Sequence, residues 1–255
     1  MLLFSTTTNV LYSILFLLLA YLIGSIPFGL VFGLIFKHKD IRKFGSGNIG
    51  STNTIRNFGF KIGIPVFILE VLKGGIMILL VRYLFDTRIF DNTIPIIFYG
   101  FAAAMGHLFP IYIGFKGGKI VAPSLGILIA LTPSCALGCL IIFLLTLLII
   151  GYVCISSCSA ALTAVIIVWI QFILGLNTDN QGLMYLFGKP ELITCIMYTI
   201  LCVIIFIRHI GNFKRLLNGT ENKAKFKVRL EEKKKARLLA KKQNISERSC
   251  KKIDF

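Results

Sequence analysis

The sequence is poor in charge, above all in negative charge. Only 11 of its 255 residues are Asp or Glu, and charged residues of both signs make up 15% of the chain. A soluble globular domain has about 25% charged residues. Because 56% of the residues are hydrophobic, the chain has too few polar side chains to cover a surface exposed to water on all sides. These shortages exclude a soluble globular protein.

The apolar residues occur in long runs, several of which approach or exceed the roughly 18 residues that indicate a transmembrane helix. Helices and closed barrels are the structures that satisfy their backbone groups in lipid, and continuous apolar runs are typical of helices. We therefore predict an all-α, polytopic integral membrane protein, with residues 1–222 as one helical bundle. No basic segment precedes the first run, so we expect a retained span rather than a signal peptide.

We expect seven transmembrane helices. Pro27 should kink or end the first of them, and Pro133 should cut a run that is too long for one span into two short helices. Tyr152–Ser157 is expected to be a brief polar connection. The expected spans are Val10–Phe36, Ile62–Leu84, Ile94–Ile113, two helices within Ile120–Gly151, Cys158–Leu174 and Glu191–Ile207.

The positions of Lys and Arg predict the orientation of these spans, because cytoplasmic loops are enriched in both residues. Seven crossings place 24 of the 28 Lys and Arg residues on one side, together with the C-terminus. We therefore expect an N-terminus outside, and cytoplasmic glycine-rich loops and C-terminus. A single helix across Ile120–Gly151 would put the most basic segment outside, against this rule.

The last part of the chain, residues 223–255, is a basic tail with thirteen Lys or Arg against four Asp or Glu. Lys223–Gln243 can form a basic helix, which we expect to be attracted to anionic headgroups at the membrane surface. Nucleic acid is not expected as a partner. The tail is tethered to the membrane and has a single aromatic residue before its last position.

Six of the seven cysteines lie in or beside apolar runs. The pairs Cys135/Cys139 and Cys154/Cys158 are each spaced four residues apart, on one face of a helix. A metal site would need further ligands, and no histidine is near either pair. We expect these cysteines to pack as small apolar side chains, and we expect no metal and no cofactor.

One polar segment between the first two runs reads FGSGNIGSTNTIRNFG, at Phe44–Gly59. Its glycines allow sharp turns that direct several N–H groups at one anion, and Arg56 adds a planar charged fork that suits phosphate. We predict a phosphate-binding loop at the membrane surface. The alternative is an ordinary polar connector whose glycines only permit turns.

Two further segments on the same side combine Gly or Asn with cations. They are GFKGGK at Gly114–Lys119 and RHIGNFKRLLNGTE at Arg208–Glu221. A histidine at the membrane edge accompanies each of them, His107 and His209. Together with the first segment they suit a site with two phosphate positions beside lipid.

Within the second span, Glu70 and Lys73 lie three residues apart on one helix face. Opposite charges inside an apolar helix are costly, so we expect these two side chains to neutralise each other or to line a polar cavity. For His107 the alternative to a role in the site is an interfacial histidine held by a hydrogen bond.

The combination of segments resembles one family, the bacterial acyl-phosphate:glycerol-3-phosphate acyltransferases (PlsY). The matching stretches follow the family's order and cover most of the chain up to Glu221. They are GSIPFG (Gly24–Gly29), SGNIGSTNTIR (Ser46–Arg56), GHLFP and GFKGGK (within Gly106–Lys119), GYVCISS (Gly151–Ser157) and RHIGNFKRLLNGTE (Arg208–Glu221). The resemblance implies seven spans in the cytoplasmic (inner) membrane of a bacterium.

The resemblance also implies a reaction. A fatty acyl group would move from an acyl phosphate to the first hydroxyl of glycerol 3-phosphate, giving a lysophosphatidic acid and inorganic phosphate in the first acylation of phospholipid synthesis. An acyl phosphate is a mixed anhydride with an adequate leaving group, and no nucleophile–base pair stands out in the sequence, so no covalent intermediate is expected. The implied partners are these substrates, the lipid bilayer and a soluble enzyme that makes the acyl phosphate.

By matching position, the resemblance assigns roles to eleven residues. The catalytic group is His209, Asn212 and Ser46, and the substrate-binding group is Asn48, Gly50, Asn53, Arg56, Gly117, Gly118, Lys119 and Ser157. Arg56 and Lys119 would bind phosphate. The two glycines before Lys119 would present backbone N–H groups, and His209 and Asn212 would position the glycerol. Either His209 or the donor's own phosphate could be the base, and Glu221 is a motif position without an assigned role.

Several positions depart from the family's pattern. Ile120 stands where the family usually has Gly, Pro123 where it has Thr, Cys154 where Ser is common, Glu70 where it has Asp, and Ile210–Gly211 where it has a more polar pair, and the long basic tail is not typical of the family. Ile120 and Pro123 adjoin the second glycine-rich segment, so we expect them to alter the geometry of this loop or the efficiency of the enzyme.

Two other functions fit part of the sequence. A transporter of a small anion would also have a kinked first span, short helices and cationic glycine-rich loops. Against it, no inverted repeat is present and the polar segments gather at one surface rather than at the midplane. A non-catalytic membrane scaffold would not need three segments suited to phosphate.

Overall fold

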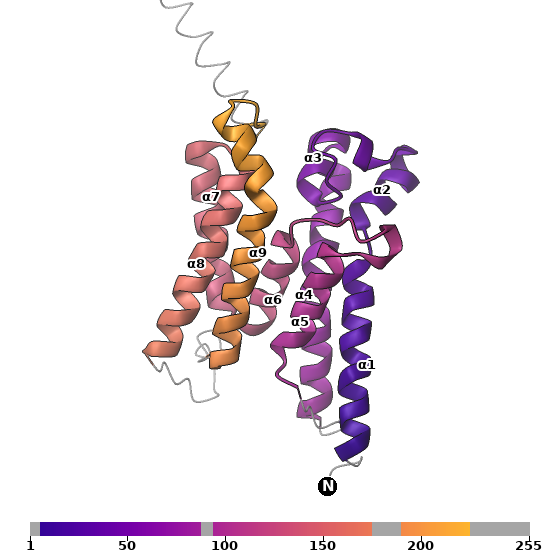
Figure 1. Cartoon of the computed structure of the whole chain (residues 1–255), viewed down its shortest axis with the longest axis vertical. Coiled ribbons are helices and arrows are strands. Elements are labelled where there is room, and N and C mark those ends of the chain that lie inside the picture. Colours follow the sequence, from indigo (N-terminus) through magenta and orange to yellow (C-terminus); the bar gives the residue numbers. More distant parts are fainter. Residues whose placement is uncertain (1–5, 88–93, 175–189, 225–255) are drawn as a thin grey trace, which may run out of the picture.

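The computed structural model describes residues 6–87, 94–174 and 190–224. Across these ranges it contains nine α-helices and two short 3₁₀ helices and no strand (Figure 1). The predicted all-α class is therefore confirmed. The predicted helix Lys223–Gln243 lies, beyond residue 224, outside the described residues.

The first predicted span consists of two helices, α1 (Thr6–Ser25) and α2 (Phe28–Lys37), which are separated at Pro27. Proline lacks the backbone N–H that would continue the helix, and its ring clashes with the preceding turn. The prediction that Pro27 ends or kinks this span is confirmed. The break lets α2 leave the direction of α1, so that α2 lies beside the segment that follows it (Figure 1).

The glycine-rich segment Phe44–Gly59 contains a helix. After the 3₁₀ helix η1 (Ile41–Lys43), the chain is irregular until Gly50, and then forms α3 (Ser51–Phe58). The interpretation of the whole segment as a loop is therefore wrong for its second half. The helix ends where Gly59 adopts φ +86°, a conformation that favours glycine.

Helix α4 (Phe60–Asp86) packs against α6 (Val121–Leu131) so closely that the backbones touch. A Cβ atom added to Gly126 would lie 1.9 Å from the carbonyl oxygen of Val71, and one added to Gly74 would lie 2.1 Å from a carbonyl oxygen of α6. Side chains larger than hydrogen do not fit at either position. Small residues allow this close approach between membrane helices, which associate mainly through packing.

Helix α5 (Ile97–Leu108) packs along α1 and is short. Its 12 residues rise about 18 Å, and the 11 residues of α6 rise about 17 Å, against about 30 Å of hydrocarbon in a bilayer. The chain between α5 and α6 includes η2 (Ile111–Ile113) and the segment GFKGGK. In Figure 1 this connection lies below the level of α2 and α3.

The second half of the chain forms α7 (Pro133–Ile150), α8 (Val153–Ile173) and α9 (Leu192–Leu217). Helix α6 ends just before Pro133, as predicted. The predicted connection Tyr152–Ser157 is wrong, because α8 already begins at Val153. Helix α9 also continues past the predicted end at Ile207. A helix forms its hydrogen bonds within its own backbone, so the polar side chains after Ile207 do not end α9.

Five helices of the described part are long and apolar enough to cross a membrane, namely α1, α4, α7, α8 and α9. Three shorter apolar stretches accompany them: α2, residues 97–113 and α6. Large apolar side chains remain exposed on the outer faces, for example Leu148 and Ile149 of α7, at 57% and 72%. Such surfaces suit lipid rather than water, so the protein is a multi-pass membrane protein.

The six described cysteines are buried and form no disulfide bond. Sγ of Cys135 lies 4.0 Å from Sγ of Cys139, and Cys154 and Cys158 lie on the first turns of α8. These side chains take part in the packing of α7, α8 and α9 as small apolar groups, as predicted. Cys250 lies outside the described residues.

Candidate active site

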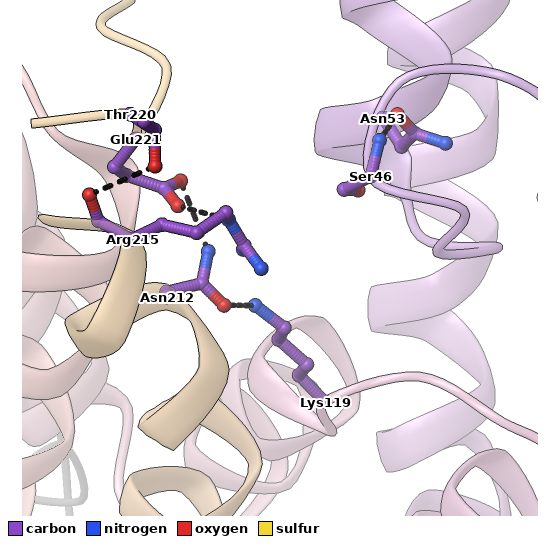
Figure 2. A network of polar contacts seen from close by, with 7 residues as sticks. All are labelled: Ser46, Asn53, Lys119, Asn212, Arg215, Thr220 and Glu221. Carbon is purple, nitrogen blue, oxygen red and sulfur yellow. Dashed lines mark hydrogen bonds and ion pairs between the residues drawn. The ribbon is translucent and has the colours of Figure 1, made fainter. Parts of the chain in front are cut away.

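Lys119 ends the loop between α5 and α6, and its ammonium donates a hydrogen bond to Oδ1 of Asn212 on α9 (Figure 2). Burial lowers the pKa of Lys119 to about 8, although the nearby carboxylate of Glu221 acts in the opposite direction. An ammonium has three donors, so one bond to Asn212 leaves donors for an anionic ligand.

Asn212 connects Lys119 to a carboxylate. Its Nδ2 donates to Oε1 of Glu221 at 3.0 Å, and Nε of Arg215 donates to Oε2 of the same carboxylate at 2.8 Å. The amide orientation of Asn212 follows from these partners, because its oxygen must face the ammonium and its nitrogen the carboxylate. Glu221, which had no role assigned from the sequence, therefore fixes both Asn212 and Arg215.

A tight turn brings Glu221 back to the helix that precedes it. Gly219 adopts φ +69°, the left-handed conformation that favours glycine. The N–H of Thr220 donates to the carbonyl of Arg215 at 2.8 Å, and the N–H of Gly219 donates to that of Leu216 at 3.1 Å. This is the Schellman pattern of helix ends, and it reverses the chain directly after α9.

His209 lies one turn before Asn212 on α9 and is 3% exposed. Its Nδ1 is 2.8 Å from the carbonyl oxygen of Ile205. A carbonyl can only accept, so Nδ1 carries the hydrogen, and the neutral ring keeps its lone pair on Nε2. In this tautomer the imidazole can accept a proton from a hydroxyl group.

The glycines before Lys119 pack on His107. A Cβ atom on Gly118 would lie 2.0 Å from Nε2 of His107, and one on Gly117 would lie 2.1 Å from the carbonyl oxygen of His107. That carbonyl accepts the N–H of Gly118 at 3.0 Å. The expectation that Gly118 presents its N–H to a phosphate is therefore corrected, because the fold uses this group. Arg208 of α9 donates to the carbonyls of both glycines, at 2.9 and 3.2 Å.

Asn53 organises the first glycine-rich segment from within. Its Nδ2 donates to the carbonyls of Phe44 and Asn48, at 3.0 and 2.9 Å, and its Oδ1 accepts the N–H of Ser46 at 3.1 Å. The side chain is 2% exposed. Its polar atoms thus hold the irregular residues against α3, and Asn53 shapes the segment rather than reaching a ligand.

The other predicted residues lie in different environments. Asn48 accepts the N–H of Gly50 at 3.0 Å through its Oδ1. Ser46 is exposed, and Arg56 is half-buried on α3. Ser157 is buried on α8 and 3% exposed.

Figure 2 shows the predicted residues in two groups. Lys119 and Asn212 form one group with the end of α9, and Ser46 and Asn53 belong to the other. The guanidinium of Arg215 extends from α9 toward the side on which the second group lies. The ammonium of Lys119 and the guanidinium of Arg215 on one side, and the exposed hydroxyl of Ser46 on the other, are suited to orienting anionic substrates.

Arg208 and Arg215 contact the residues predicted for the site but were not among the residues predicted from the sequence. Both lie within the quoted motif, which was read as a polar segment after the last span. If α9 is extended through this motif, Asn212 and Arg215 fall three residues apart on one helix face. Helical spacing was therefore the signal that could have identified Arg215.

Ile120, the residue after Lys119, has φ +55° and is fully buried. A β-branched residue rarely adopts this left-handed conformation, which costs about 1–2 kcal/mol. Burial of the side chain in the core offsets that cost. The family's usual glycine would adopt this conformation without strain. Isoleucine at position 120 therefore introduces backbone strain but adds a side chain that packs in the core.

Alanine within a helix usually gives a more stable protein than glycine does. At position 120 we expect the opposite order of stability for the glycine and alanine variants. Both variants lose a buried side chain, which costs about 2–5 kcal/mol, but only alanine keeps the strain. We expect Ile120→Gly to be more stable than Ile120→Ala by about 1 kcal/mol, and both to be less stable than the parent. Denaturant unfolding in detergent measures this, and an alanine variant equal to or above the glycine variant would contradict it.

Comparison with known proteins identifies relatives over most of the chain. A family model described as glycerol-3-phosphate acyltransferase matches residues 14–219. A glycerol-3-phosphate acyltransferase of Acholeplasma laidlawii is 38% identical over 222 residues, 84% of this chain and 94% of the relative. One of Listeria welshimeri is 41% identical over 220 residues, 84% of this chain and 97% of the relative. The family match ends before the basic tail.

Two solved structures have a similar fold. Both are crystal structures of PlsY, described as an integral membrane glycerol 3-phosphate acyltransferase. The glycerol 3-phosphate form has a TM-score of 0.67 at 33% identity and covers 83% of this chain and 95% of its own. The lysophosphatidic acid form has a TM-score of 0.63 at 32% identity, with the same coverage.

Proposed function

The chain belongs to the glycerol-3-phosphate acyltransferase family, and from this membership we propose that its acyl donor is an acyl phosphate and its products are a lysophosphatidic acid and inorganic phosphate. The protein is thus an acyltransferase of phospholipid synthesis. The single structural observation that supports the proposal is the partly buried series of hydrogen bonds from Lys119 through Asn212 to Glu221, which holds one ammonium beside the membrane helices. This membership removes the support for an anion transporter.

The reaction needs positioning more than chemical activation. The first hydroxyl oxygen of glycerol 3-phosphate attacks the carbonyl carbon of the acyl phosphate, and the bond from that carbon to the phosphate oxygen breaks. Phosphate leaves, and the hydroxyl proton goes to Nε2 of His209 or to the departing phosphate. Both substrates are anionic and repel each other, so an enzyme gains by placing cations between or beside them.

The site geometry supports a division of these tasks. We assign Lys119 and Arg56 to the substrate phosphates, as the resemblance implies, and Arg215 to the same anionic region. Asn212 acts through Lys119, because both polar atoms of its side chain are engaged with Lys119 and Glu221. His209 remains available to the glycerol hydroxyl through Nε2.

The remaining assignments concern the first segment and α8. The resemblance places Ser46, Asn48, Gly50, Asn53 and Ser157 at the site. Hydrogen bonds within the segment support a shaping role for Asn53 and Asn48, whereas the exposure of Ser46 leaves its hydroxyl accessible to a substrate.

For the membrane we propose seven crossings, with α5 and α6 as two short spans beside the five long ones. The direction of the chain in Figure 1 supports this count, because α1, α5, α7 and α9 run toward one end and α4, α6 and α8 toward the other. The charge distribution supports an outside N-terminus and a cytoplasmic site in the bacterial inner membrane. A soluble enzyme that makes the acyl phosphate is the implied functional partner.

The proposal is tested with purified protein in detergent or lipid. Palmitoyl phosphate and glycerol 3-phosphate are supplied, and inorganic phosphate and lysophosphatidic acid are both measured. We expect the two products in equal amounts and only when both substrates are present. Phosphate release without glycerol 3-phosphate would indicate a hydrolase, and acyl transfer that requires a different acyl donor would overturn the proposed donor.

The pKa of Lys119 predicts the pH dependence of the reaction. With a pKa lowered to about 8, the ammonium is charged below pH 8 and loses its proton above it. Glycerol 3-phosphate is already a dianion in this range, since the second phosphate pKa is about 6. We expect kcat/KM for glycerol 3-phosphate to fall above pH 8, by up to about tenfold per pH unit, in assays from pH 6.5 to 9.5.

The Lys119→Arg variant is the matched control, because arginine stays charged throughout this range. The kcat/KM that this variant retains for glycerol 3-phosphate should not decrease above pH 8. The same decrease in the arginine variant would assign the titration to a different group.

A further inference from the structure

Three ionisable side chains to which no role has yet been assigned meet inside the bundle. Oε2 of Glu70 lies 2.7 Å from Nζ of Lys73 and 2.8 Å from Nδ1 of His107. All three side chains are at most 4% exposed. Pairing of Glu70 with Lys73 along α4 was one of the two alternatives expected from the sequence, and the structure adds His107 from the last turn of α5.

Packing alone does not account for this cluster. Charged side chains within a membrane helix are costly, and a buried ion pair adds little stability over apolar residues of the same volume. Lys73 has structural partners outside the cluster, since its ammonium donates to the carbonyl of Ile26 at 2.9 Å and lies 5.6 Å from the ring centroid of Phe28, both at the break between α1 and α2. His107 has another, the backbone that leads to Lys119.

The imidazole of His107 packs directly against the backbone of Gly118, the residue before Lys119. Because a Cβ on Gly118 would be 2.0 Å from Nε2, the Gly118 backbone rests directly on the ring. The carbonyl of His107 accepts the Gly118 N–H at 3.0 Å, and Arg208 holds the glycine carbonyls from α9. The backbone before Lys119 is therefore held by His107 on one side and by Arg208 on the other.

We propose that Glu70 and His107 form a positioning pair for Lys119. Glu70 holds the imidazole of His107 through Nδ1, and the imidazole supports the glycine backbone that places the Lys119 ammonium at the substrate phosphate. The inference rests on the proposed function, because it takes Lys119 as a phosphate-binding cation. Neither member of the pair contacts the substrate, so both act through Lys119.

A double-mutant cycle tests this dependence. His107→Ala removes the support but leaves the ion pair between Glu70 and Lys73 intact. We expect it to raise KM for glycerol 3-phosphate about 10- to 100-fold, with a smaller change in kcat, because small displacements of a binding group have effects of this size. In the Lys119→Ala background, His107→Ala should change kcat/KM by less than about twofold, because the residue through which it acts is gone.

Ile97→Ala is the matched control. Ile97 lies on the same helix, is 1% exposed, and is about 15 Å along α5 from His107. It should lower stability without raising KM for glycerol 3-phosphate. If His107→Ala does not fold, His107→Gln retains an N–H for Glu70, and we expect a smaller rise in KM that is again lost in the Lys119→Ala background.

The outcomes separate the inference from the proposed function. The positioning pair would be overturned if His107→Ala lowered kcat/KM by the same factor with and without Lys119. It would also be overturned if Ile97→Ala raised KM for glycerol 3-phosphate as much as His107→Ala does. In either case the activity of the enzyme would remain established. If the parent protein shows no turnover, the same cycle is measured as the Kd for glycerol 3-phosphate. A parent that neither turns over nor binds glycerol 3-phosphate would overturn the proposed function, and the inference with it.

Discussion

Lys119→Ala is expected to lower kcat/KM for glycerol 3-phosphate by about 10²- to 10³-fold. The substitution deletes the one ammonium that Asn212 holds in the site, whereas the contacts of Glu221 with Asn212 and Arg215 persist. Electrostatic donors aimed at a reacting anion have effects of this size because they are oriented before the substrate arrives. The measurement is the initial rate of phosphate release at varied glycerol 3-phosphate.

Two further variants show whether the effect belongs to Lys119. Lys61→Ala removes an exposed lysine from the first turn of α4, on the same predicted side of the membrane, and should leave kcat/KM within about twofold. Lys119→Arg keeps the charge in a larger group, and its kcat/KM for glycerol 3-phosphate should lie between those of the parent and the alanine variant. An alanine variant within about threefold of the parent would show that Lys119 does not bind the reacting anions.

Gly126→Ala is expected to destabilise the protein by about 3 kcal/mol, the upper part of the range for over-packing. The new methyl group would lie 1.9 Å from the carbonyl oxygen of Val71, which belongs to helix backbone and has no rotamer to change. The two helices α4 and α6 must therefore separate along their contact. Thermal or denaturant unfolding in detergent measures the loss.

Gly211→Ala provides the comparison, because the same change is made where there is space. The nearest atom to the added methyl group is Nη1 of Arg215, at 3.8 Å, and the residue is exposed on α9. Alanine in a helix is favoured over glycine, so this variant should gain about 0.5–1 kcal/mol. Equal stability of Gly126→Ala and the parent would mean that α4 and α6 do not require this close approach.

The helix breaks were predictable because proline determines them locally. Pro27 and Pro133 lack the N–H that would continue a helix, and α1 and α6 end just before them. The helix over residues 208–217 was not predicted, since charge was taken to end the span. Charge limits where a helix can lie in the membrane, but it does not interrupt its backbone hydrogen bonds.

Most of the residues proposed for the site were named from motifs, whereas their contacts could not be predicted from the sequence. Lys119 and Asn212 are 93 positions apart, and no local rule links them. Glu70 and Lys73 are three apart, so their pairing followed from helical spacing, but the approach of His107 depends on how α5 packs on α4. Glu221 reaches its partners only because the chain turns back at Gly219. This turn is formed by hydrogen bonds to the last carbonyl groups of α9, and the end of that helix was not predicted.

The Schellman turn after α9 affects the order in which a newly made chain becomes active. Both glycine-rich segments leave the ribosome, and the helices beside them can insert into the membrane, well before Asn212 and Glu221 are synthesised. Until the turn closes, Asn212 and Arg215 lack the carboxylate of Glu221 that orients them, and Asn212 is the residue that holds Lys119. Nascent chains should therefore insert without consuming substrate, and a premature stop before Gly219 should yield an inserted protein without activity.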